Sequence, residues 1–155
     1  MKKTSIAFLN IALLFFCVRV YGGEVTRLTG RVTCDDRDCI LRLELTNASD
    51  KMIRTEDSFL PWGIRDSLTL VAFAKATDRH LTRSAAIDDL RHNRIAIPPG
   101  MTLRGDVSLK DRFPTLLAEL KRGNKILLFW SYRLLTIDNT ITERHFGGTA
   151  IGGDS

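Results

Sequence analysis

The sequence is poor in the residues and motifs that mark an enzyme. Its 155 residues include three cysteines and three histidines. There is no G-x-S-x-G nucleophile elbow, no phosphate-binding P-loop and no H-E-x-x-H zinc motif. The histidines, His80, His92 and His145, are too scattered along the chain to indicate a shared site and are expected on the surface. These absences predict a non-enzymatic protein with no catalytic residue, no cofactor and no metal.

Dense basic clusters are missing as well. The chain has 23 basic and 18 acidic residues, a net charge of +5. Three of the basic residues, Lys2, Lys3 and Arg19, belong to an N-terminal leader, and without them the balance is 20 against 18, or +2. No run of Lys and Arg reaches the density of a phosphate-binding patch. Nucleic acid is therefore not an expected partner.

Residues 1–22 have the three parts of a secretory signal peptide. Lys2 and Lys3 form a short basic start, an apolar run covers positions 6–18, and small residues lie near a cut after Gly22. A retained membrane anchor is the alternative, although the run has 13 residues where a spanning helix needs roughly 20. The MKKT opening is typical of bacteria. The mature protein is therefore predicted to be periplasmic or secreted, without stable insertion in a membrane.

Residues 23–155 are long enough for one domain with its own hydrophobic core. They lack the repeats, low-complexity segments and Pro/Ser-rich linkers that would divide the chain. One domain is therefore predicted. The glycine-rich tail at 147–153 is flexible in composition, and disorder is expected after about residue 152.

Cys34 and Cys39 are the two cysteines outside the leader, and they flank a polar tip in the segment TCDDRDC. Two thiols in an oxidising compartment usually pair, so a disulfide across a tight hairpin is predicted. The tip lacks the six or more spaced oxygen ligands and the glycine of a calcium loop. A solvated turn is expected, with a protruding plug for another protein's active site as the alternative. The tip residues are candidate partner-binding residues: Asp35, Asp36, Arg37 and Asp38.

The C-x4-C spacing of this segment is similar to the inhibitory loop of the bacterial inhibitors of vertebrate lysozyme. The resemblance covers six residues, Cys34 to Cys39, and rests on the cysteines and an aspartate. The rest of the chain does not share it. The resemblance implies a loop that enters the active site of a hydrolase.

Alternating apolar residues predict that most of the chain forms strands. The pattern is clearest from Cys39 to Thr46, where one parity is apolar and the other is polar. The stretch from Lys125 to Asp138 is apolar on both parities for much of its length, which predicts a central strand buried on both faces. Gly105 is a possible bulge within its strand. The other strands are expected at 52–55, 67–76, 94–97, 101–109 and 140–146.

One helix is expected near 114–122. Phe113, Leu116, Leu117 and Leu120 share a helical face, and Gly123 suits the helix end. Many short strands with Gly, Pro and Asn turns favour an all-β fold, a single immunoglobulin-like β-sandwich with this one short helix, over a barrel.

The aromatic residues give the remaining indication of function. Trp130 and Tyr132 share one face of the longest strand and are expected in the core. Trp62, in the loop FLPWG, either packs under its loop or contacts a partner, and is a candidate partner-binding residue.

The sequence thus predicts an exported, non-enzymatic protein-binding β-sandwich, whose partner is another envelope or extracellular protein. An inhibitor or immunity protein against an envelope or extracellular hydrolase is the alternative. A small secreted hydrolase is third, because paired carboxylates can hydrolyse glycosides and a sequence does not show their separation.

Overall fold

The computed structural model describes residues 25–63, 68–84, 93–138 and 140–152, and strands make up most of them. The predicted all-β class is confirmed. The predicted leader and the residues after 152 lie outside the described residues. The strands are β1 (Thr26–Cys34), β2 (Cys39–Asn47), β3 (Ile53–Glu56), β4 (Leu68–Ala74), β5 (Arg79–His80), β6 (Arg94–Ile97), β7 (Thr102–Ser108), β8 (Ile126–Leu135) and β9 (Ile141–Ile151). The helices are η1 (Asp57–Phe59), α1 (Leu109–Arg112) and α2 (Leu116–Lys121).

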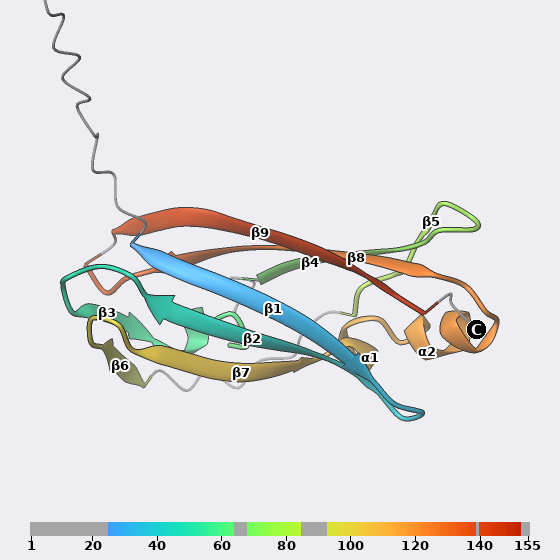
Figure 1. Cartoon of the computed structure of the whole chain (residues 1–155), viewed down its shortest axis with the longest axis horizontal. Coiled ribbons are helices and arrows are strands. Elements are labelled where there is room, and N and C mark those ends of the chain that lie inside the picture. The colour runs from blue at the N-terminus through green and yellow to red at the C-terminus, as the bar shows by residue number, and fades with distance from the viewer. Residues whose placement is uncertain (1–24, 64–67, 85–92, 139, 153–155) are drawn as a thin grey trace, which may run out of the picture.

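The strands form two main layers. One sheet has the order β1-β2-β7 and the other β5-β4-β8-β9, while β3 and β6 pair separately, and every pairing is antiparallel. In Figure 1, β9, β4 and β8 run above β1, β2 and β7. The buried parities of β2, β4 and β8 meet in one hydrophobic core, as the alternation along β2 predicts.

β8 lies between β4 and β9, so its predicted central position is confirmed. Trp130 and Tyr132 are buried, also as predicted. Burial on both faces is wrong, because no described layer covers the outer side of this sheet. Phe129, on the outer parity, is 48% exposed.

Three further expectations are corrected. The one helix expected near 114–122 is present as the shorter α2, but a second short helix, α1, capped by Ser108, precedes it, and Phe113 is buried between the two. β9 continues through the glycine-rich segment to Ile151, so residues 147–151 are an ordered strand. Gly105 forms no bulge, because it keeps a regular register opposite Leu43.

The β1–β2 hairpin runs from the end of the molecule that carries β3 and the β8–β9 turn to the disulfide tip (Figure 1). Its pairing begins with Thr26 opposite Asn47 and closes with Cys34 opposite Cys39. Asn47 is fully buried at the first end, where its side-chain amide donates hydrogen bonds to the carbonyls of Lys51, at 2.7 Å, and Ile97, at 2.8 Å. The two ends therefore differ in kind: one is a cluster of turns around Asn47, and the other is the disulfide tip.

Candidate functional site

The disulfide tip projects from the body of the molecule. Cys34 and Cys39 face each other at the last pair of the hairpin and are disulfide-bonded, as predicted. In Figure 1 the tip extends past α1 at the lower right. A cross-link at the base of a loop limits the conformations of the residues beyond it. The disulfide therefore restricts the conformations of the four tip residues.

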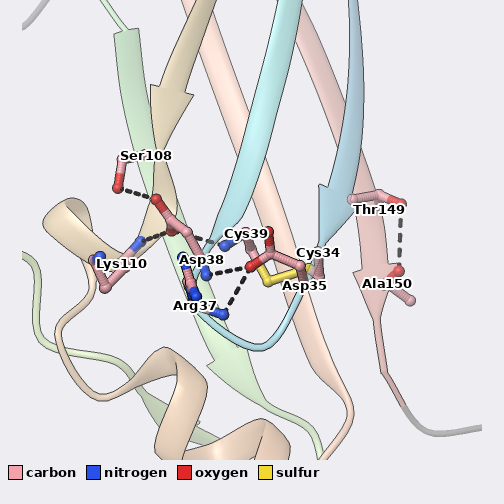
Figure 2. Close-up of a disulfide and its surroundings, with 9 residues drawn as sticks. All are labelled: Cys34, Asp35, Arg37, Asp38, Cys39, Ser108, Lys110, Thr149 and Ala150. Atoms are coloured by element: carbon pink, nitrogen blue, oxygen red, sulfur yellow. Dashed lines mark hydrogen bonds between the residues drawn. A yellow bond between two sulfur atoms is a disulfide. The ribbon is translucent and has the colours of Figure 1, made fainter.

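Asp35 organises the turn within the tip. Its Oδ1 accepts hydrogen bonds from the backbone N–H groups of Arg37, at 2.7 Å, and Asp38, at 2.9 Å (Figure 2). Its own N–H donates to the carbonyl of Asp38 at 2.9 Å. The two backbone donors lower the pKa of the Asp35 carboxyl below its usual range, with a small contribution from the charge of Lys110. Asp35 is thus an internal part of the turn.

Asp38 ties the tip to the start of α1. Its carboxylate accepts hydrogen bonds from the hydroxyl of Ser108, at 2.6 Å, and the backbone N–H of Lys110, at 3.0 Å (Figure 2). It also accepts from the backbone N–H of Cys39 at 2.7 Å. The second carboxylate of the tip is therefore also used inside the molecule.

The remaining tip residues, Asp36 and Arg37, are both exposed. Within the described part of the chain, neither side chain has a hydrogen bond or an ion pair. The structure therefore divides the four candidate residues into two that hold the turn and two that it presents to solvent.

A groove of about 350 Å³ lies beside the tip, and the sequence did not point to it. Leu117 and Leu120 of α2 and Ile151 of β9 give it apolar walls. The sequence pattern identified Leu117 and Leu120 only as members of a helical face. The turn of the chain before α2 brings them to the tip. The full lining is Cys34, Asp35, Asp36, Leu117, Leu120, Lys121, Ile151 and Gly152.

Glu119 holds α2 in place beside this groove. Its side chain is 3% exposed and bonds to the guanidinium groups of Arg79 and Arg122, the latter at 2.8 Å. Its other oxygen accepts a hydrogen bond from the amide of Asn124 at 2.6 Å. One carboxylate thus joins the β4–β5 hairpin, α2 and the segment before β8.

Trp62 is placed elsewhere. It is half-buried against the core, and its indole lies on Gly105 of β7: a Cβ at that glycine would lie 2.0 Å from the indole. Trp62 is not among the residues that line the groove at the tip. The structure therefore does not bring Trp62 together with the tip residues.

The one hydroxyl–imidazole contact in the described part is buried. His145 Nε2 lies 2.8 Å from Thr26 Oγ1 and 3.7 Å from Glu143 Oε1. Thr26 is fully buried, and the contact links β1 to β9. The His145 side chain is 9% exposed, so its expected surface position is wrong; His80 is exposed and packs on Phe73.

The described residues also lack two other features. No three His, Cys, Asp or Glu side chains among them gather closely enough to hold a metal ion. No helix in the same residues has the length and apolar character needed to cross a membrane.

Comparison with known proteins gives no further guide, since no protein-family model and no curated protein matches this chain.

Proposed function

We propose that this protein is an exported, non-catalytic binding protein that contacts another envelope or extracellular protein through its disulfide tip. The observation that carries the proposal is that the tip residues have two different roles. The disulfide, Asp35 and Asp38 fix the loop, while Asp36 and Arg37 point out with no internal partner. A loop backbone that is fixed before binding and lies beside an apolar groove suits protein recognition, since little backbone entropy is lost on binding.

The scaffold supports the same reading. Lettering β1, β2, β4, β5, β7, β8 and β9 as A, B, C, C′, E, F and G gives the sheets A-B-E and C′-C-F-G, an order that favours an immunoglobulin-like sandwich. Domains of that class often bind other proteins, although a fold alone does not define a function. The disulfide is compatible with an extracellular or periplasmic location, and the leader at residues 1–22 supports export.

An inhibitor or immunity protein is a narrower form of this proposal. It is favoured by the projection of the closed tip past α1, because a narrow, braced loop can enter a concave active site. In that form the partner is a hydrolase, and binding blocks its activity.

Site-specific photo-crosslinking in the producing cell tests the proposal. A photoreactive residue at Arg37 is expected to capture one discrete protein. The same residue at Arg42, exposed on the outer face of β2, serves as the matched control. The proposal requires capture at Arg37 that excess wild-type protein suppresses. Equal capture at both positions, or none at Arg37, would contradict it. The inhibitor form further requires that the captured protein be a hydrolase and that the wild-type protein, but not an Asp36→Ala/Arg37→Ala variant, lower its activity.

A further inference from the structure

The end of the molecule opposite the tip has an apolar rim. Seven large apolar side chains are exposed in the described residues, and five of them lie where strands begin or turn at this end. Val25 precedes β1, Met52 precedes β3 and Met101 precedes β7. Ile137 follows β8, and Ile141 begins β9. Apolar side chains gathered on one surface indicate a contact site more strongly than single exposed ones do.

Part of this rim is concave. A groove of about 330 Å³ opens between the start of β3 and the β8–β9 turn, a volume within the range of small-molecule sites. Val25, Met52 and Ile137 contribute both to the rim and to the groove. The lining consists of Val25, Met52, Ile53, Arg54, Thr136, Ile137, Asp138, Thr140 and Thr142.

The polar lining groups of the groove are mostly used within the protein. The hydroxyl of Thr136 is shared between the carboxylate of Asp138 and the carbonyl of Thr140. The hydroxyl of Thr142 lies 3.1 Å from the backbone nitrogen and 3.3 Å from the carbonyl oxygen of Leu134. Asp138 Oδ1 also accepts from the backbone N–H of Thr140, so this carboxylate helps to hold the turn while keeping its negative charge. The groove therefore offers a ligand few polar partners along its walls.

The groove lining carries one cationic side chain, Arg54, and one anionic side chain, Asp138. A second groove, of about 280 Å³, lies beside the first, and Arg54 and Ile137 line both. Arg94 and Ile95 line the second groove only. Arg54 and Arg94 are exposed, and neither guanidinium has a hydrogen bond or ion pair with the described part of the protein. A guanidinium forms its strongest hydrogen bonds with a carboxylate or a phosphate.

We infer that this end binds a single-chain amphiphile with an anionic head, of the fatty-acid class. Its alkyl chain lies in the groove against Met52, Val25 and Ile137. Its carboxylate pairs with the guanidinium of Arg54, at the boundary between the two grooves. An uncharged apolar ligand would leave that guanidinium unpaired, and a short anion would leave the apolar walls exposed. The site lies at the opposite end of the molecule from the proposed protein contact and does not depend on it.

Titration calorimetry at pH 7.5 with dodecanoate, below its micelle concentration, tests this inference on the protein purified as the cell produces it. Saturable binding at one site is expected. Dodecanol, which has the same chain without the charge, is expected to bind about tenfold more weakly or worse. The Arg54→Gln variant should lose a similar factor, and Met52→Ser should also weaken binding. The matched controls Arg133→Gln and Phe146→Ser alter an exposed cation and an exposed apolar side chain on the outer face of the β8–β9 pair, and neither residue lines the groove. Both should bind within about twofold of wild type.

Several results would overturn the inference. One is equal affinity for dodecanoate and dodecanol, because the charge would then not be recognised. Another is weakening by the controls as large as by Arg54→Gln and Met52→Ser, which would indicate nonspecific adsorption. The last is the absence of dodecanoate binding. That result overturns the inference whether the protein instead sediments with phosphatidylglycerol vesicles, self-associates through this end, or does neither. Melting curves for all four variants confirm that each is folded at the temperature of the titration.

Discussion

The indole of Trp62 lies against Gly105 of β7, so closely that a side chain at position 105 has no room. A Cβ there would lie 2.0 Å from indole Cδ2 and 2.3 Å from Cγ. Because Gly105 belongs to the inward parity of an edge strand, the ring closes the side of the core below β7. This contact favours packing over partner binding for Trp62.

Replacing Trp62 by alanine should therefore destabilise the fold. Large-to-small changes of aromatic core residues cost about 3–5 kcal/mol, and a half-buried ring belongs at the lower end of that range. For a domain of this size the melting temperature should fall by roughly 10 °C. Gly105→Ala should also destabilise the protein, since the indole must move. A Trp62→Ala variant that melts like wild type would restore Trp62 as a surface contact.

Two adjacent glycines in β9 should respond differently to the same substitution. A Cβ on Gly147 would lie 2.3 Å from the buried indole of Trp130, which is also closed in by Gly30 of β1. A Cβ on Gly148 would meet the ring of Phe129 at 2.8 Å, but that side chain is half exposed and can swing away. Gly147→Ala should cost about 1–3 kcal/mol and Gly148→Ala clearly less. Urea denaturation of the two variants measures the difference. Equal losses would mean that the Trp130 ring is not confined as described.

Removing the Glu119 carboxylate should loosen α2. Its partners Arg79 and Arg122 are more than half exposed and can be rehydrated, so the cost stays below that of breaking a fully buried ion pair. A loss of about 2 kcal/mol is expected for Glu119→Ala in denaturant unfolding. Glu44→Ala, which breaks the exposed pair with Arg104, is the matched control and should cost about 1 kcal/mol or less. Similar losses for the two variants would contradict the assigned role of Glu119.

The order of the tip should depend on acid pH through Asp35. The N–H donors of Arg37 and Asp38 favour the charged carboxylate and lower its pKa. A lowered pKa in the folded state stabilises the turn above the unfolded value of about 3.9, and the stabilisation is lost as the pH falls through the folded pKa. Carboxyl-carbon NMR titration should show Asp35 with a midpoint below 3.9. The amide signals of the tip should shift with the same midpoint, and a midpoint at or above 3.9 would exclude the turn described.

The sequence predicted the features of this structure that depend on contacts between residues close together in the chain. Alternation and turn residues predicted β2 and β6 to within one residue, and the Cys34–Cys39 spacing predicted the hairpin and its disulfide. Each of these features is determined within about ten residues of chain. The length of β9 was missed because its glycines read as a flexible tail. In the fold, Gly147 is required by the indole of Trp130, which comes from another strand.

The candidate site was predictable to the same degree. The composition of the tip predicted that it is exposed, but it did not predict the separate roles of Asp35 and Asp38. Asp38 is fixed by Ser108 and Lys110, about seventy residues away in sequence. The groove beside the tip depends on Leu120 and Ile151, which meet only through the packing of α2 against the end of β9.

The most direct test of the proposed function is the affinity of one pair of double variants for the captured partner. Asp36→Ala/Arg37→Ala removes the two presented side chains and leaves the bonds of Asp35 and Asp38 in place. Arg42→Ala/Asp106→Ala removes an exposed acid–base pair from the outer face of the β2–β7 pair. Interferometry on the immobilised partner should show at least about a tenfold rise in Kd for the tip variant, and less than about a twofold change for the control. Equal affinities for the two variants, with both folded, would contradict binding through the disulfide tip.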